Sequence, residues 1–262
     1  MALALLAALL IITLASIYLF VAHPWWFPAG VSAFAPSVDH EFNTAFWLLG
    51  SLFVAAQLLL LLFLARGWRK KKSSYLAGNW RIELGWTLGI AALFFWFHVS
   101  GGKLWSSMML HEPEVGALKI EVTGAQFQWY FRYPGPDGVF GHVDAQKFAN
   151  AAEGNGLGID PNDPTGRDDV VSTTLMLPVG REVELDLRGQ DVIHSLFIPA
   201  MRFKQDTVPG MTIKTRLKPT QVGSFEIACA ELCGTGHYRM RAVARVVSEE
   251  QFAAWLKSRR QQ

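Results

Sequence analysis

The residues with the clearest chemical meaning lie in one short stretch near the end of the chain. Within 12 residues the sequence supplies two thiols, an imidazole and a thioether: Cys229, Cys233, His237 and Met240. Soft sulfur ligands select copper and similar ions. Two glycines between them allow the chain to fold tightly around one point. A second imidazole is expected from His194, because it lies in an apolar run that is typical of a strand.

The number of ligands distinguishes between kinds of copper site. A mononuclear blue-copper site uses two histidines, one cysteine and a weak axial methionine, and this chain offers one more cysteine. Two thiolates can bridge two copper ions, each of which then has one histidine and one weak axial ligand. Met240 would serve one ion, and the backbone carbonyl of Glu231 would serve the other. Such a compact pair moves little on redox change, which suits electron transfer.

Other interpretations of these residues remain open at this point. A Cys2His2 zinc site is the commonest alternative, but it would leave Met240 without a role. A redox-active cysteine pair usually has the spacing C-x-x-C within a βαβ pattern, whereas Cys229 and Cys233 are four apart. The joint occurrence of all six positions favours copper.

The second half of the chain has the pattern of an all-β domain, residues 112–262, that would position these ligands. Short alternating or β-branched segments separated by Gly, Pro and Asp predict a sandwich or barrel; they are Lys119–Thr123, Thr174–Leu177, Val183–Leu187, Ile213–Leu217 and Ala242–Val247. Residues 140–169 have no period and predict one long surface loop. Ser248 and Gln251 form a capping-box pattern that predicts a short closing helix.

Charge and composition exclude several classes of protein. Residues 112–262 carry 17 Lys+Arg against 19 Asp+Glu and no basic stripe, which argues against a nucleic-acid partner. The whole chain is 51% hydrophobic and only 18% charged, which is too apolar for an ordinary soluble enzyme. The excess of apolar residues lies in the first 111 positions.

Three uncharged runs in that first part are long enough to cross a bilayer as helices of about 30 Å: Ala2–Ala22, Ala45–Ala65 and Leu84–Gly102. Residues 66–81 between the last two runs carry six positive charges and no acid: Arg66, Arg69, Lys70, Lys71, Lys72 and Arg81. The positive-inside rule places this loop in the cytoplasm. We therefore predict a transmembrane hairpin over residues 45–104 and an extracytoplasmic domain after it.

The first run, residues 1–22, is either a retained helix or the core of a signal peptide. No basic residue precedes it, and no small-x-small cleavage site follows closely. We expect a retained transmembrane helix or signal anchor.

Several motifs together resemble subunit II of the haem–copper cytochrome c oxidases. They are Asp191-Val-Ile-His194-Ser, Val208-Pro-Gly and Cys229-Ala-Glu-Leu-Cys-Gly-Thr-Gly-His-Tyr-Arg-Met240. The resemblance runs from the second apolar run to the end of the chain, apart from residues 140–169. It implies a membrane-anchored all-β protein, with a helical hairpin followed by a cupredoxin-like β-sandwich. It also implies a binuclear copper centre, CuA, with the ligands His194, Cys229, Glu231 through its carbonyl, Cys233, His237 and Met240.

The resemblance further implies an activity and partners. In this family CuA accepts electrons from cytochrome c or a related c-type donor and passes them to haem in subunit I. There O2 is reduced to water, and protons are pumped across the bacterial plasma membrane. The implied partners are subunit I with its haem and CuB, other oxidase subunits and membrane lipid. The Glu231 carboxylate would help hold a magnesium ion at the boundary with subunit I.

Two further motifs resemble parts of the family's proton and electron paths. Glu83-Leu-Gly-Trp-Thr87 resembles the family's E-x-x-W-T, whose Glu lies at the entrance of a proton path, and the predicted orientation puts Glu83 at the cytoplasmic end. Gly124-Ala-Gln-Phe127-Gln-Trp129 resembles G-x-Q-W-x-W, whose first Trp is where electrons arrive. Phe127 replaces that Trp here, and Trp129 keeps the second position.

Docking of a basic c-type donor requires acidic groups near the copper. Asp191 is the first candidate, because it lies three residues before His194. Acids of the long loop are further candidates: Asp160, Asp163, Asp168 and Asp169.

Other protein classes share part of this pattern. A subunit II of a quinol oxidase has the same fold but lacks the copper ligands. A membrane-anchored copper chaperone or thiol oxidoreductase carries C-x-x-x-C with its His far downstream, whereas His237 follows Cys233 by four residues. A nitrous-oxide reductase shares the copper motif, but this chain has no room for its catalytic domain.

Overall fold

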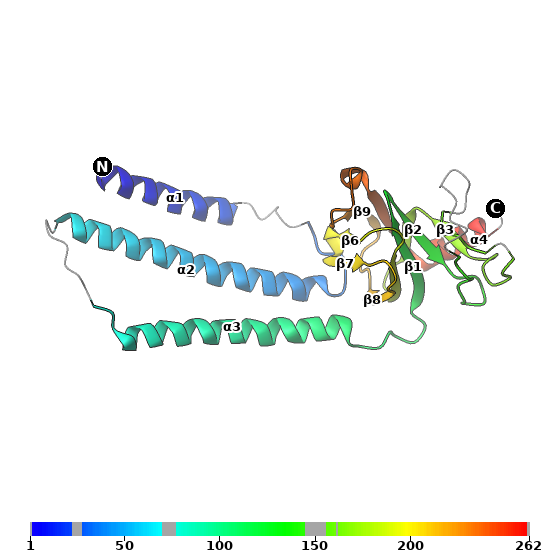
Figure 1. The fold of residues 1–262 in the computed structure, drawn as a ribbon, viewed down its shortest axis with the longest axis horizontal. Coiled ribbons are helices and arrows are strands. Elements are labelled where there is room, and N and C mark those ends of the chain that lie inside the picture. Colours follow the sequence, from blue (N-terminus) through cyan, green and yellow to red (C-terminus); the bar gives the residue numbers. More distant parts are fainter. Residues whose placement is uncertain (1, 23–27, 70–76, 145–155, 161, 261–262) are drawn as a thin grey trace. The chain divides into compact units, whose positions relative to one another are not determined.

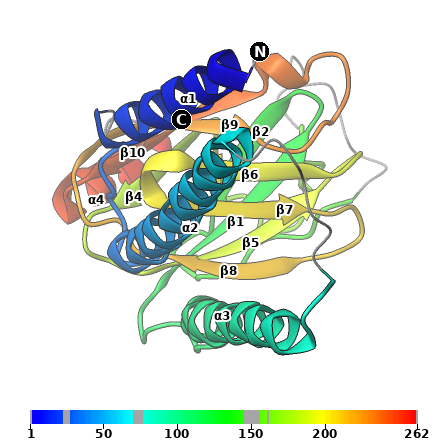
Figure 2. The same ribbon diagram turned by 90° about the vertical axis from the view of Figure 1, so that its left-hand side faces the viewer.

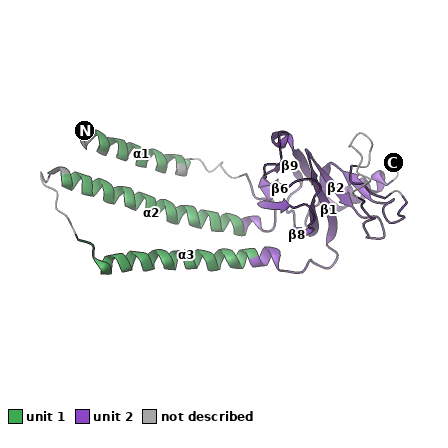
Figure 3. Ribbon diagram, viewed as in Figure 1, with its two compact units in different colours: residues 1–28, 37–105 green, residues 29–36, 106–262 purple. Residues whose placement is uncertain are grey.

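The computed structural model describes the chain except for residues 1, 23–27, 70–76, 145–155, 161 and 261–262. It divides into two compact units, Met1–Pro28 with Ser37–Trp105 and Ala29–Pro36 with Ser106–Gln262 (Figure 3). The first unit contains long helices, and the second contains all of the described strands (Figure 1).

The helices of the first unit are α1 (Ala2–Ala22), α2 (Ala35–Arg69) and α3 (Trp80–Met109). By length and composition, α2 and α3 are able to cross a membrane. Both extend beyond the uncharged runs. Pro36 suits the first turn of α2, so this helix begins ahead of its apolar part. Asn79 precedes α3 and accepts a hydrogen bond from Arg81 N at 3.0 Å, which is the geometry of an N-cap. The basic residues Lys70–Lys72 lie outside the described residues.

The second unit is a sandwich of two five-stranded sheets, ordered β3-β2-β1-β5-β8 and β4-β10-β9-β6-β7 (Figure 2). The strands are β1 (Leu118–Ala125), β2 (Gln128–Tyr133), β3 (Val170–Ser172), β4 (Thr174–Pro178), β5 (Val183–Gly189), β6 (His194–Ile198), β7 (Phe203–Thr207), β8 (Ile213–Leu217), β9 (Gly223–Cys229) and β10 (Arg241–Val247). Two pairs are parallel, β1 with β5 and β10 with β4. Every segment predicted as a strand falls within one of these elements.

Alternation along the strands builds the core. In β5 the side chains of Val183, Leu185 and Leu187 are completely buried between the sheets; burial of each such side chain contributes about 1.5–3 kcal/mol. Helix α4 (Glu249–Arg259) begins at the predicted capping box of Ser248 and Gln251. It lies beside β4 (Figure 2).

A short segment that precedes α2 and includes its first two residues also belongs to this unit, a feature that we did not predict. We call residues 29–36 the strap. Val31 N donates to Ala200 O at 2.8 Å, and Val31 O accepts from Thr220 N at 2.9 Å. Ser32 Oγ donates to Met201 O at 2.6 Å. Val31 is buried, so the strap is an integral part of the sandwich.

Candidate metal centre

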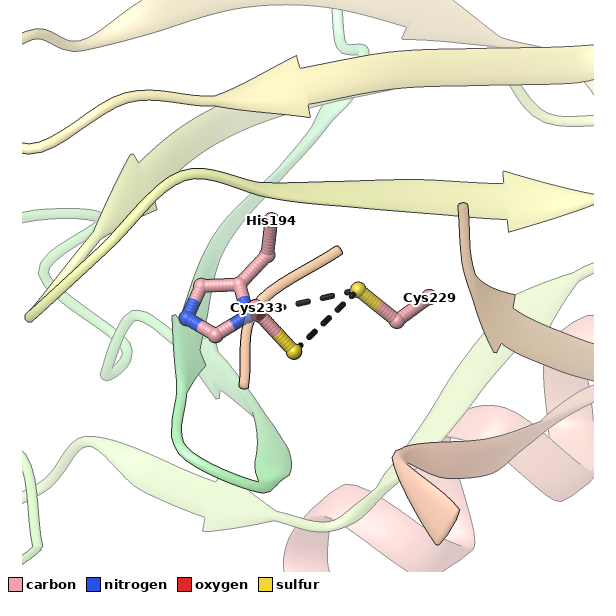
Figure 4. A group of neighbouring side chains, drawn as sticks. All are labelled: His194, Cys229 and Cys233. Atoms are coloured by element: carbon pink, nitrogen blue, oxygen red, sulfur yellow. Dashed lines mark hydrogen bonds between the residues drawn. The ribbon is translucent and has the colours of Figure 1, made fainter. Parts of the chain in front are cut away.

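Strand ends and one connecting segment bring the predicted copper ligands together. His194 is the first residue of β6, and Cys229 is the last residue of β9. These strands are neighbours, with Leu196 opposite Cys229. The segment after Cys229 turns through a short 3-10 helix, His237–Arg239, before β10 begins. Figure 4 shows His194, Cys229 and Cys233 gathered around one point.

Donor atoms from all six predicted positions surround that point. The two sulfurs, Cys229 Sγ and Cys233 Sγ, lie 3.9 Å apart. Beside the first sulfur are an imidazole nitrogen and a carbonyl oxygen: His194 Nδ1 at 4.0 Å and Glu231 O at 3.2 Å. Beside the second are an imidazole nitrogen and a thioether: His237 Nδ1 at 3.6 Å and Met240 Sδ at 3.7 Å. Each thiol therefore has one imidazole and one weak donor.

The spacing of the sulfurs fits a shared metal. A disulfide bond is about 2.05 Å long, far shorter than the 3.9 Å found here. A metal–thiolate bond of about 2.3 Å allows one ion between the sulfurs to reach both. Thioether and thiolate are ligands that copper accepts, and a tetrahedral zinc site would leave the methionine unused. The donor set therefore fits copper.

Burial controls the protonation of one thiol. Burial raises the pKa of the Cys233 thiol to about 11, and the neighbouring Cys229 adds to this shift. Metals bind the thiolate form, so binding of a metal here must displace a proton.

Asp191 contacts a ligand directly. Its Oδ1 lies 2.8 Å from His194 Nε2. Burial alone would raise the pKa of Asp191, but hydrogen bonds from His194 and from backbone N–H groups outweigh burial and keep this pKa below its usual value. A carboxylate bonded to the far nitrogen of a metal-binding histidine orients the ring. The Asp191 side chain is 33% exposed, and its docking role remains a prediction.

Both aromatic residues of the predicted electron path lie beside the metal donors. Trp129 is buried, and its ring centroid is 6.0 Å from that of His194 in an edge-on arrangement. The Phe127 ring packs against Gly236 so closely that a Cβ on this glycine would overlap it. The roles of Phe127 and Trp129 in electron transfer remain predictions.

One of the predicted loop acids, Asp169, is placed differently from our expectation. Asp169 Oδ2 accepts from Arg132 Nε at 2.8 Å, and Arg132 lies four residues along β2 from Gln128. At 3.3 Å per residue this is about 13 Å from the end of β2 that adjoins the metal donors. The Asp169 side chain is also completely buried, which disfavours a docking role for it; the docking roles of Asp160, Asp163 and Asp168 remain predictions. The charge of Asp169 instead neutralises a buried guanidinium.

Two other predicted residues have no described metal partner. The Glu231 side chain is exposed. Among the described residues, the one group of three His, Cys or acidic side chains close enough to share an ion is His194, Cys229 and Cys233. Glu83 lies in the first turn of α3 in the other unit. The magnesium role of Glu231 and the proton-path role of Glu83 remain predictions.

Comparison with known proteins places the chain in a family. A sequence model described as cytochrome C oxidase subunit II, periplasmic domain, matches residues 118–247. The alternative cytochrome c oxidase subunit 2 of Bradyrhizobium diazoefficiens is 34% identical over 260 residues, which cover 96% of this chain and 90% of that protein. The chain belongs to the cytochrome c oxidase subunit II family.

Further members are similar over much of their length. Cytochrome c oxidase subunit 2 of Cereibacter sphaeroides is 28% identical over 250 residues, covering 88% of this chain and 81% of that protein. The crystal structure of the periplasmic domain of subunit II of cytochrome oxidase (CoxB) of Bradyrhizobium japonicum is 29% identical, with a TM-score of 0.42. That match covers 58% of this chain and 98% of the other.

Membership in the family confirms the predicted fold class. This subunit II has apolar N-terminal helices and a mostly β, cupredoxin-like periplasmic domain. It is a membrane-anchored subunit of a cytochrome c oxidase. The quinol-oxidase, chaperone and nitrous-oxide reductase alternatives are not favoured.

Proposed function

We propose that electrons reach the oxidase through this subunit, and that it holds a binuclear copper centre, CuA. The observation that carries the proposal is the pair of sulfurs 3.9 Å apart, each with an imidazole nitrogen and one weak donor beside it. Copper bound there would supply a one-electron couple whose charge is shared between two ions.

The chain's own residues prepare this site. Cys229 and Cys233 lose their protons and supply two negative charges. His194 and His237 each present Nδ1, and the weak donors complete each side. Because β6 and β9 are hydrogen-bonded neighbours, His194 and Cys229 are held on a rigid frame. A rigid site lowers the reorganisation that opposes electron transfer.

The remaining parts of the proposal concern partners. Cytochrome c or a related c-type donor delivers electrons near Phe127, and haem in subunit I receives them for reduction of O2 coupled to proton pumping. Glu83 lies at the entrance of a proton path, and Glu231 helps to hold magnesium beside subunit I. The chain resides in the bacterial plasma membrane, with α1 as a retained helix.

Rapid mixing of the assembled oxidase with reduced c-type cytochrome tests this function. We expect the copper absorption to disappear before haem in subunit I is reduced. Oxidase in which zinc replaces this copper should lack the early phase and reduce its haem far more slowly. Haem reduction at the wild-type rate in the zinc form would contradict the proposal.

A further inference from the structure

The turn between β1 and β2 joins two parts of the metal pocket that are distant in sequence. The backbone N–H of Gln126 donates to Asp191 Oδ2 at 2.7 Å, and its side-chain Nε2 donates to the carbonyl oxygen of Cys233. We propose that Gln126 and Asp191 act together as positioning residues, the Gln126–Asp191 clamp, which holds His194 and Cys233 in the geometry that copper requires. This inference rests on the proposed copper centre.

The Asp191 half of the clamp sets the orientation and tautomer of His194. Asp191 Oδ1 lies 2.8 Å from His194 Nε2 and accepts from Val192 N at 2.7 Å. An ionised carboxylate only accepts hydrogen bonds, so Nε2 must carry the proton. The lone pair of Nδ1 is then left facing Cys229 Sγ at 4.0 Å. His194 is completely buried, so water cannot replace this partner.

The Gln126 half of the clamp holds the segment that carries Cys233. Its amide bonds the Cys233 carbonyl, and the next residue, Gly234, has a φ of +128°. A Cβ on Gly234 would lie 2.9 Å from Gln126 Nε2. The close approach of the Gln126 amide and the left-handed backbone therefore both require glycine at position 234. Gln126 thus lies directly against the segment that carries Cys233.

The same turn also packs against His194 from a second side. A Cβ on Gly124 would lie 3.0 Å from His194 Cδ2, so the backbone of β1 lies directly against the imidazole. The Phe127 ring covers Gly236. Hydrogen bonds and packing thus fix both ligands to one turn, as expected of groups that orient metal ligands.

Two variants of the assembled oxidase test the clamp. Asp191→Asn keeps the size of the side chain but removes its negative charge. The amide N–H of the new side chain would then face the backbone N–H of Gln126, so that hydrogen bond is lost. We expect copper affinity, measured by chelator competition, to fall about 10- to 100-fold. Loss of a negative charge beside His194 also favours the reduced form of the copper pair over the oxidised form. The reduction potential of the copper pair should therefore rise. Each tenfold change in the ratio of reduced to oxidised copper at equilibrium corresponds to about 59 mV.

Gln126→Ala removes the bond to Cys233 without a change in charge. We expect a shifted copper spectrum and faster copper loss, with a smaller change in potential than in Asp191→Asn. Glu226→Gln is the matched control, because Glu226 lies on β9 with Cys229 but pairs with the exposed Arg241 at 3.3 Å. This control should keep the wild-type affinity, spectrum and potential. The haem content of each variant reports assembly.

The outcomes separate this inference from its alternatives. If Asp191→Asn changes only the rate of electron arrival and its salt dependence, with affinity, spectrum and potential unchanged, Asp191 is a docking residue and the clamp is wrong. Wild-type behaviour of Gln126→Ala in all three measurements would also overturn it. If the wild-type subunit holds no two-copper centre, the proposed function itself fails, and the inference fails with it.

Discussion

The two ends of β2 bury polar groups in opposite ways. Toward its C-terminal end, the Arg132 guanidinium lies against the carboxylates of Glu121 and Asp169, and all three side chains are at most 4% exposed. Arg188 Nε also lies 3.3 Å from Glu121, so two guanidiniums and two carboxylates are paired there within the protein. At the other end, the thiols and imidazole Nδ1 atoms of the metal centre face one another. Once the two thiols are deprotonated, only a bound cation balances their negative charge. The kind of groups that face one another, and not their burial, therefore distinguishes a candidate metal centre from a buried ion pair.

The largest expected effect is at the metal end. Cys229→Ser and Cys233→Ser each remove one thiolate that would bridge the proposed copper pair, and a hydroxyl is a poor copper ligand at neutral pH. Each variant should lose the binuclear spectrum completely, as measured by optical absorption of the purified oxidase. Retention of the wild-type spectrum in either variant would show that the thiolates do not bridge.

The next largest effect is at the other end. Arg132→Met removes the guanidinium that pairs with buried Asp169 and leaves Glu121 with Arg188, whose Nε lies 3.3 Å away. Removal of one member of a buried ion pair costs about 3–5 kcal/mol. We expect the free energy of unfolding to fall by this amount in denaturant titrations followed by tryptophan fluorescence. The copper spectrum should remain unchanged in the folded variant. A changed spectrum would mean that the two ends are not independent.

The pH dependence of copper affinity tests whether the thiols at the metal end of β2 lose protons when copper binds. With its pKa raised to about 11, the Cys233 thiol is protonated in the metal-free protein at neutral pH. Copper displaces this proton, so a lower proton concentration favours the bound state. Apparent affinity should rise with pH by about tenfold per unit for each proton released. Chelator competition across neutral pH measures this slope, and a flat profile would rule out thiol deprotonation on binding.

The smallest effect is expected for an exposed pair on the same sheet. Arg241 and Glu226 are 3.3 Å apart, and both side chains are more than half exposed. Arg241→Met should lower the free energy of unfolding by less than about 1 kcal/mol. A loss as large as that of Arg132→Met would remove the distinction between buried and exposed charges on which the comparison depends.

Local signals in the sequence predicted much of this molecule. Thiol, imidazole and thioether groups within one turn-rich segment predicted the cluster of donor atoms around Cys229 and Cys233, because such groups are rarely found together by chance. The period of two predicted β5, and the pair Ser248 and Gln251 predicted the start of α4. Each of these signals lies within a few residues.

Features that depend on contacts between distant segments could not be predicted. The strap lies beside Ala200 and Thr220 only because the sandwich brings them together. The bond from Gln126 to Cys233 spans 107 residues, and nothing local to either residue indicates it. The burial of Asp169 follows from its pairing with Arg132, which the pattern of a loop does not reveal.

The measurement that tests the central claim most directly is electron paramagnetic resonance of the purified subunit, combined with its copper-to-chain ratio. We predict two copper ions per chain and one unpaired electron shared equally by two copper nuclei, because both thiolates bridge the pair. One copper per chain in a fully loaded sample, with the electron confined to a single nucleus, would contradict the account.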